Sequence, residues 1–388
     1  MRKLIRVGLI VGSALLIALP AWVSRHPASK PKVATISVST ALGNDNTQGY
    51  LRVYTPRPFV FPADHGPHPE YRNEWWYVTG NLKDTQGRLF GYQLTLFRIA
   101  LTPTLPVPDS AWRTNQLYLG HFAVTDVAGG RHYGFDRFSR AALGLAGAQV
   151  RPLRVWLEDW SLSGSGEDAL PLQVRAHEQD VTVNLILQAG KPVVLQGDKG
   201  LSQKSDEPGN ASYYYSYTRL PTQGTVVVRG QTFTVSGSSW LDREWSTSAL
   251  GPEQSGWDWF ALQLEDGREL MFYRLRLQNG GVDPHSSGIL VAADGSTHRL
   301  RYDEVELKVL DTWTSPYTGD RYPSRWVLRL PAESLELTII PRLLDQEMRV
   351  SVHYWEGAVA VAGRAGDRPI RGQGYLEMTR YEPPDHVM

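Results

Sequence analysis

Two carboxylic acids in the second half of the chain stand in a setting that favours proton transfer. Asp242 and Glu244 belong to the sequence WLDREW. Successive side chains of a β-strand point to opposite faces, so Asp242 and Glu244 should share one face and Arg243 the other. Trp240 and Trp245 are the expected apolar walls. A carboxyl group kept neutral by such walls can donate a proton to carbon, the step that begins water addition to an alkene.

The same two acids also have a structural interpretation. Either acid could form an ion pair with Arg243, Arg274 or Arg276, or could accept hydrogen bonds from backbone groups at the seam of a barrel. The sequence leaves the catalytic and the structural interpretation open.

A loop rich in Gly and Pro supplies a second set of ionisable groups. Asp64, His65, His68 and Glu70 place two imidazoles and two carboxylates within seven residues. A metal needs converging ligands on rigid elements, and this loop offers no clear third ligand. We therefore predict no metal and no other cofactor. Turn and capping duties are the alternative role for Asp64 and His65.

Histidines are the expected partners of the acids because an imidazole gains and loses its proton near neutral pH. We predict that His65 or His68 acts as a base or hydrogen-bond donor at a barrel mouth, near Glu74 or His121. The candidate catalytic residues are Asp242, Glu244, His65, His68 and His121.

Aromatic side chains are abundant, with 13 Trp and 18 Tyr. Adjacent Trp75 and Trp76 should face opposite sides of a strand, whereas Trp257 and Trp259 should share one side. Such rings suit the walls of an apolar cavity and equally the core of a barrel, and both roles stay open. The residues predicted to contact a ligand are Glu74, Trp76, Tyr92, Trp240, Trp245, Trp257, Trp259 and Tyr273.

The elements that must position these residues are β-strands. Period-two alternation marks the stretches 89–97, 181–187, 225–229, 269–277 and 349–354. Turn signals such as Asp266-Gly267, Asn279-Gly280 and Asp294-Gly295 separate strands as in antiparallel hairpins. We predict an all-β fold built of antiparallel barrels, because closing a sheet removes its exposed edges.

An internal repeat divides the chain in two. The sequence EWWYV from Glu74 recurs as DWFAL from Asp258, and SSWL ending at Leu241 is similar to QGYLE ending at Glu377. A repeat period above a hundred residues indicates duplicated domains and not a solenoid. We place the boundary near residue 247, which gives an N-terminal domain of residues 51–247 and a C-terminal domain of residues 248–388.

A family resemblance rests on long segments. FPADHGPHPEYRNEWWYVTGNL at 61–82 resembles the opening signature of the AttH-like proteins, which are related to carotenoid 1,2-hydratases. Similar segments are HFAVTD at 121–126, WLDREW at 240–245 and GWDWFALQL at 256–264. Together they span most of residues 58–380. The resemblance implies two lipocalin-like barrels in an exported bacterial protein of the kind described as predicted secreted hydrolases. It implies the fold more firmly than it implies a reaction.

Two positions depart from the related hydratases. Their pattern carries a histidine in an Asp-His-Asn-Trp segment, whereas this chain has Arg243 and Glu244 between Asp242 and Trp245. Arginine stays protonated at neutral pH and cannot alternate as acid and base. The departure argues against hydration of a carotenoid in particular.

The N-terminus predicts export. Three basic residues precede an apolar run at 7–19, the pattern of a signal peptide or membrane-anchor helix at residues 1–24. Residues 25–50 have the composition of a linker. We expect a periplasmic protein tethered to the inner membrane by this segment, or a secreted protein if the segment is cleaved.

Composition excludes several classes of protein. The 40 basic and 40 acidic residues balance, so no broad positive field exists to bind nucleic acid. The absence of cysteine excludes disulfides and thiolate chemistry. No P-loop, dinucleotide-binding glycine pattern or Gly-x-Ser-x-Gly elbow stands at a strand–helix junction, which argues against nucleotide enzymes and α/β-type serine hydrolases.

We expect the protein to bind a hydrophobic molecule such as a lipid, an isoprenoid or an acyl chain. As an enzyme it would hydrate or hydrolyse that molecule. As the alternative, a non-catalytic carrier or chaperone, it would pass the molecule to an ABC-type envelope transporter. A purely structural envelope protein, with barrels filled by side chains, is a third interpretation.

Overall fold

The computed structural model describes residues 47–104, 107, 110–166, 169–247, 250–379 and 381. Within these ranges the chain forms 23 strands and three single-turn 3-10 helices, η1 (Ala63–His65), η2 (Tyr302–Glu304) and η3 (Pro331–Glu333). The predicted all-β fold class is confirmed. Residues 1–24 and nearly all of the predicted linker 25–50 lie outside the described residues. In the part of the chain that is described, no helix has the length and apolar character needed to cross a membrane.

Thirteen strands form the first sheet. They are β1 (Asn73–Asp84), β2 (Leu89–Ala100), β3 (Gln116–Asp126), β4 (Arg131–Arg140), β5 (Ala146–Gln149), β6 (Arg154–Leu157), β7 (Trp160–Gly164), β8 (Leu172–Glu178), β9 (Val181–Leu187), β10 (Val194–Leu195), β11 (Leu201–Gln203), β12 (Ala211–Val228) and β13 (Gln231–Ser246). Their order is β4-β3-β2-β1-β13-β12-β9-β8-β7-β6-β5, with β10 and β11 paired to β12.

Ten strands form the second sheet. They are β14 (Gln254–Leu264), β15 (Glu269–Leu277), β16 (Ser287–Val291), β17 (Thr297–Arg301), β18 (Glu306–Thr314), β19 (Arg321–Leu330), β20 (Leu335–Pro341), β21 (Glu347–Arg349), β22 (His353–Ala365) and β23 (Arg368–Thr379). Their order is β17-β16-β15-β14-β23-β22-β20-β19-β18, with β21 paired to β22. The chain changes sheets between Ser246 and Gln254, the interval that contains the predicted domain boundary.

Alternating side chains explain why these segments pair as strands. In β8, Leu172, Val174 and Ala176 are buried, and in β9 so are Val181 and Val183, while the residues between them are more exposed. The predicted hairpin turns also hold: Gly267 and Gly295 have φ values of 86° and 87°, in the region that glycine adopts without steric cost. Asp266-Gly267 joins β14 to β15, and Asp294-Gly295 joins β16 to β17.

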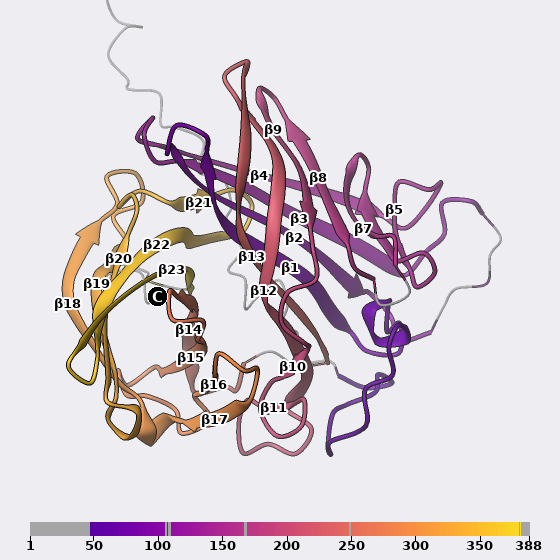
Figure 1. Cartoon of the computed structure of the whole chain (residues 1–388). Helices are drawn as coiled ribbons and strands as arrows, with labels where there is room; N and C mark the ends of the chain where they lie inside the picture. The colour runs from indigo at the N-terminus through magenta and orange to yellow at the C-terminus, as the bar shows by residue number, and fades with distance from the viewer. Residues whose placement is uncertain are drawn as a thin grey trace, which may run out of the picture. The chain divides into compact units, whose positions relative to one another are not determined.

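Each sheet encloses its own apolar core. The first sheet folds over on itself, so that β6 packs against β2, β3 and β4 around Trp76, Phe122 and Trp160. The strands β14 to β23 of the second sheet curl round, as Figure 1 shows. They enclose a core that includes Phe260, Trp326 and Trp355. The prediction of two antiparallel barrel-like sheets is confirmed.

A third core lies between the sheets, which belong to one compact unit. Tyr77, Tyr214 and Trp240 from the first sheet pack with Trp259 and Tyr273 from the second. These side chains point away from the barrel interiors, and their rings cover surfaces that would otherwise face water. The candidate site lies at this junction.

Candidate active site between the two sheets

Asp242 and Glu244 lie on the face of β13 that is turned toward the second sheet. Both line a cavity there, while the side chain of Arg243 packs over Trp76 in the first sheet's interior, with 3.9 Å from guanidinium carbon to ring centre. The predicted alternation along this strand is therefore confirmed. Trp245 is buried in the core of the first sheet, so only Trp240 of the two predicted walls shares the face of the acids.

Asp242 is a buried carboxyl group held by three neutral donors. The Tyr214 hydroxyl donates to Oδ2 at 2.6 Å, and the Ser216 hydroxyl and the Trp240 indole donate to Oδ1 at 2.5 and 2.6 Å. Burial raises the pKa of Asp242 to about 7, although these three hydrogen bonds oppose the shift. The group therefore exists in both protonation states near neutral pH, as a general acid requires.

Glu244 has a different environment although it is only two residues away. Lys204 Nζ lies 3.0 Å from Glu244 Oε1, and Ser212 donates a hydrogen bond to the same oxygen. Burial tends to lower the pKa of Lys204, but the charge and hydrogen bond of Glu244, together with Tyr273 and Asp242, offset this, and the net pKa is raised. Lys204 is thus a fixed cation and Glu244 its counter-ion, whereas Asp242 has neutral partners.

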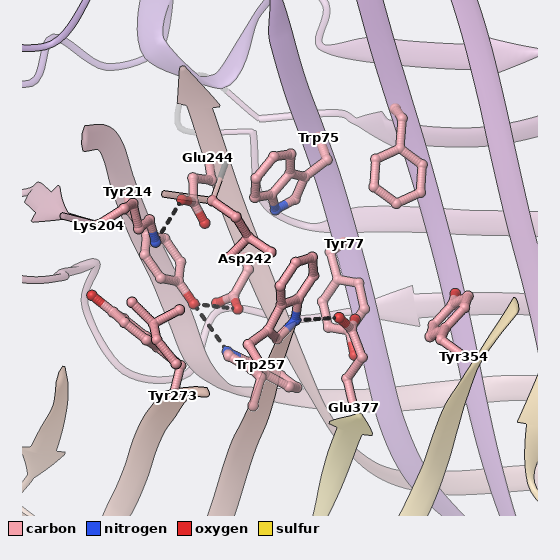
Figure 2. A pocket seen from close by; sticks show the side chains of 14 residues that line it. Trp75, Tyr77, Lys204, Tyr214, Asp242, Glu244, Trp257, Tyr273, Tyr354 and Glu377 are labelled. Carbon is pink, nitrogen blue, oxygen red and sulfur yellow. Dashed lines mark hydrogen bonds and ion pairs between the residues drawn. The ribbon is translucent and has the colours of Figure 1, made fainter. Parts of the chain in front are cut away.

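The cavity has a volume of about 100 Å³. Figure 2 shows its aromatic and carboxyl side chains converging from strands of both sheets. The lining residues are Trp75, Tyr77, Phe97, Lys204, Tyr214, Asp242, Glu244, Leu250, Trp257, Trp259, Tyr273, Leu275, Tyr354 and Glu377. The site therefore combines an apolar, aromatic wall with three carboxyl groups and one ammonium group.

Glu377 on β23 is a second acid with properties close to those of Asp242. The Trp257 indole donates to Glu377 Oε1 at 2.6 Å. Burial raises the pKa of Glu377 to about 7, against hydrogen bonds that lower it. Its side chain is partly exposed to the cavity, so a ligand there could reach it.

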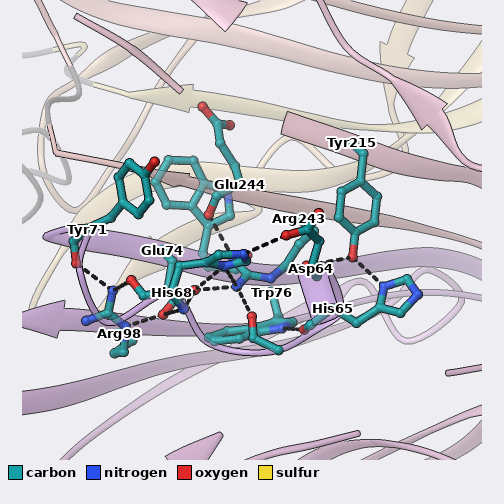
Figure 3. Close-up of polar contacts among 12 residues, drawn as sticks. Asp64, His65, His68, Tyr71, Glu74, Trp76, Arg98, Tyr215, Arg243 and Glu244 are labelled. Atoms are coloured by element: carbon teal, nitrogen blue, oxygen red, sulfur yellow. Dashed lines mark hydrogen bonds and ion pairs between the residues drawn. The ribbon is translucent and has the colours of Figure 1, made fainter. Parts of the chain in front are cut away.

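The predicted histidine loop lies elsewhere, inside the first sheet. Figure 3 shows His68 and Glu74 in one polar network with Arg98 and Arg243. Both guanidinium groups form ion pairs with Glu74, and His68 Nδ1 lies 3.3 Å from Glu74 Oε2. Burial alone would raise the pKa of Glu74, but the two arginines hold it below its usual range. His68 lies near Glu74, as expected, but the network does not line the cavity.

Both loop histidines have structural contacts. The His68 ring stacks on Trp245, with ring centres 3.8 Å apart, and His68 Nε2 lies 3.1 Å from Asp64 Oδ1. His65 Nδ1 lies 2.6 Å from the Tyr215 hydroxyl. Neither imidazole lines the cavity that contains Asp242, so the structure does not bring these bases to that acid.

His121 approaches the cavity through one intermediate side chain. Its Nδ1 lies 2.8 Å from the hydroxyl of Tyr354, which lines the cavity. Burial lowers the pKa of His121 to about 4, so the ring is neutral at physiological pH. His121 is therefore placed to orient Tyr354 and not to touch a ligand.

The predicted ligand contacts divide between the two faces of the strands. Trp257, Trp259 and Tyr273 line the cavity, and Trp240 contacts it through Asp242. The other four, Glu74, Trp76, Tyr92 and Trp245, are buried on the first sheet's side, away from the cavity. The residues that sequence reasoning missed include Lys204, Tyr354 and Glu377. Glu377 had a signal, because the repeat aligns it with Asp242, whereas Lys204 lies in no recognisable motif.

Among the described residues, one group with metal-type ligands occurs, in the second sheet at Asp320, Glu347 and His353. The carboxylate of Glu347 already accepts hydrogen bonds from the hydroxyls of Ser315 and Thr318, at 2.7 and 2.8 Å. His353 Nε2 lies 2.7 Å from the same carboxylate. These hydrogen bonds account for the cluster without a cation.

The fold and site define a class: an antiparallel two-sheet β protein with an acid-containing aromatic cavity between its sheets. A sequence profile of the AttH-like family matches residues 52–381, and the chain belongs to this family. An AttH candidate from Nitrosomonas europaea is 32% identical, with a TM-score of 0.75 over 85% of this chain and 99% of that one. No curated protein matches the chain in sequence.

More distant structures share the fold. Kievitone hydratase from Nectria haematococca is 15% identical, with a TM-score of 0.66 over 86% of this chain and 97% of that one. CghA is 13% identical, with a TM-score of 0.54 over 86% of this chain and 96% of that one. At these identities the likeness shows the fold alone.

Proposed function

We propose that this protein adds water to a carbon–carbon double bond of an apolar molecule, or removes it in the reverse direction, with Asp242 as the acid. The observation that carries the proposal is the state of Asp242. It is a buried carboxyl group with only neutral hydrogen-bond donors, and it faces an aromatic cavity. Such a carboxyl group is still partly protonated near neutral pH and can protonate carbon.

The cavity walls suit the cation that this protonation creates. Trp75, Tyr77, Trp257 and Trp259 surround the space with aromatic rings. The faces of these rings attract positive charge, the same interaction that binds ammonium groups in aromatic cages. A carbocation formed beside Asp242 would be stabilised until water attacks it.

The size of the cavity limits what reacts inside it. An engineered cavity of about 150 Å³ in another protein binds benzene, and the cavity here measures about 100 Å³. It therefore accepts a group about as large as one isoprene unit. The remainder of a larger substrate would stay outside it.

The departure at position 243 does not touch this chemistry. Arg243 lies on the opposite face of β13 from Asp242 and pairs with Glu74. The exchange of histidine for arginine therefore leaves the acid's side of the strand unchanged, whereas Glu244, in place of asparagine, lines the cavity beside Asp242. The shared fold with kievitone hydratase, a hydratase by its name, further supports the proposed reaction class.

The carrier alternative is less well supported by the site. A carrier of lipids needs room for a whole acyl chain, and pockets for drug-sized ligands measure roughly 300–1,000 Å³. A cavity of about 100 Å³ favours action on one end of a molecule. Export, the membrane tether and an envelope transporter as partner remain predictions.

The proposal is tested by incubating the protein, without residues 1–24, in oxygen-18 water with prenol, geraniol, squalene or a bacterial lipid extract. Mass spectrometry should find a product that has gained one labelled water. A co-purified or added molecule that stays bound and unchanged in every incubation would contradict the enzyme and support the carrier.

A further inference from the structure

Behind Glu377 lies a second acid that the proposed acid step does not use. Glu356 on β22 is directly opposite Glu377 on β23 in the strand register. Glu356 is completely buried, and the Tyr77 hydroxyl donates to its Oε1 at 2.6 Å. Its other oxygen, Oε2, has no N–H or O–H donor among the described residues.

Their side chains are direct cross-strand neighbours on one face of the sheet, and hydrogen bonding between them contributes to the pKa of each. A hydrogen bond between two carboxyl groups requires a proton on one of them, because two carboxylates offer only acceptors. Burial raises the pKa of Glu356 well above its usual value, and the charge of Glu377 raises it further. The pair is therefore built to hold one proton near neutral pH.

Only one member of the pair reaches the cavity. Glu377 lines the cavity with Trp257, its indole donor, whereas Glu356 does not. Figure 2 shows Glu377 and Asp242 directed into the same space from strands of different sheets. A molecule in the cavity would therefore lie between Asp242 of the first sheet and Glu377 of the second.

We propose that Glu377 is the base of this site: sharing one proton with Glu356, it accepts the proton that water loses as water attacks the carbon cation. The inference rests on the proposed hydration. The O–H bond of Asp242 breaks as a C–H bond forms. A water oxygen then bonds to the cationic carbon, and its proton passes to the glutamate pair. Transfer of that proton through solvent back to Asp242 restores both groups.

Glu356 is a positioning residue in this scheme, because it acts only through Glu377. The other titratable groups that line the cavity are Asp242, Glu244 and Lys204, together with the hydroxyls of Tyr77, Tyr214, Tyr273 and Tyr354. The charge of Lys204 is paired with Glu244, so Lys204 does not serve as a counter-ion for Glu356 and Glu377.

Infrared difference spectra between pH 5 and pH 9, with no substrate present, test the shared proton. The wild type should show protonated-carboxyl bands that disappear across neutral pH. Glu377→Gln should remove the pair's band, Glu356→Gln should shift it, and Asp242→Asn should leave it in place. A band that is unchanged in both glutamine variants would overturn the shared proton.

The role as base is tested with geraniol in deuterated water. Glu377→Gln should lower hydration by about 100-fold, yet deuterium should still enter the alkene, because Asp242 continues to protonate carbon reversibly. Asp242→Asn should lose both. Glu356→Gln removes the carboxyl group whose hydrogen bond lowers the pKa of Glu377, so the acidic limb of the pH–rate profile should move to higher pH, which a purely structural role would not do.

Two results separate the failures. Hydration by Glu377→Gln at the wild-type rate would overturn Glu377 as base and leave the proposed function standing. If the wild type neither hydrates geraniol nor exchanges deuterium into it, the proposed function is contradicted for this alkene. The proposed role of Glu377 as base is then contradicted as well. The Asp367→Asn variant, in the exposed turn between β22 and β23, is the control.

Discussion

Asp242 and Glu377 face one cavity from the last strand of each sheet. Asp242 on β13 is opposite Tyr77 of β1, and Glu377 on β23 is opposite Trp259 of β14, which the repeat aligns with Trp75. Each acid accepts a hydrogen bond from an indole. The two sheets thus each direct an acid into one cavity, and the two acids have different neighbours that allow different roles.

The hydroxyl of Tyr214 should tune the acid. It donates to Asp242 and accepts from the Trp259 indole at 3.2 Å. Because the first of these bonds favours the carboxylate, Tyr214→Phe should raise the pKa of Asp242 further, and the alkaline limb of the pH–rate profile should move to higher pH. The loss of positioning should lower kcat by about tenfold.

Tyr273→Phe is the matched control for that experiment, since Tyr273 lines the same cavity but bonds to Ser202 instead. Its pH–rate profile should match that of the wild type. Equal alkaline limbs in wild type and Tyr214→Phe would refute the role of this hydroxyl.

Stability should fall with pH where Asp242 titrates. The pKa of Asp242 is about 7 in the folded protein and about 3.9 in an unfolded chain. The folded state therefore binds more protons between these values, and the free energy of unfolding decreases as pH rises through this window. Urea denaturation should show a slope about 1.4 kcal/mol per pH unit steeper in wild type than in Asp242→Asn. Parallel slopes would show that Asp242 is ionised throughout.

The Glu74 network should be structural. Glu74 is completely buried between Arg98 and Arg243. Glu74→Gln leaves two buried guanidinium groups without their counter-ion and should lower the free energy of unfolding by about 3–5 kcal/mol. Urea denaturation measures this loss. The folded fraction should retain wild-type turnover, because the network does not line the cavity; a kcat that falls in folded protein would place Glu74 in the reaction.

A cationic probe should report the ionisation of the cavity without any substrate. Protonated N,N-dimethyldodecylamine carries a positive tip on an apolar chain and mimics the proposed carbocation. Asp242 and Glu377 lose their protons near pH 7, so the affinity measured by calorimetry should rise between pH 6 and pH 8. The Asp242→Asn/Glu377→Gln double variant should lose this rise, and an unchanged pH dependence would count against both acids.

The fold could be predicted from the sequence because its signals are local. Alternation in stretches such as Val181–Leu187 and glycine turns such as Asp266-Gly267 depend on neighbouring residues alone. Alternation also placed Asp242 and Glu244 on one face, opposite Arg243. Alternation also explains the position of Trp245. Its side chain points to the same side of the strand as that of Arg243, into the core of the first sheet, and so does not shield the acids.

Which residues line the cavity depends on how the two sheets pack against each other, and local sequence patterns do not predict that packing. Lys204 and Tyr354 reach the cavity from segments 150 residues apart. His68 and Glu74 stood out by residue type, but the first sheet encloses them in an ion-pair network. A cluster of ionisable residues in the sequence can therefore form a buried ion-pair network, as His68 and Glu74 do, and does not by itself identify a reactive site.

The central claim is that Asp242 donates the proton that begins water addition. Its most direct test is the initial rate of labelled-water addition at pH 6 by wild type, Asp242→Asn and the exposed control Asp367→Asn, using a substrate from the oxygen-18 incubations. We predict a fall in kcat of about 10²–10⁴-fold for Asp242→Asn with the fold and KM retained, and no change for the control. Equal rates in wild type and Asp242→Asn would contradict the account.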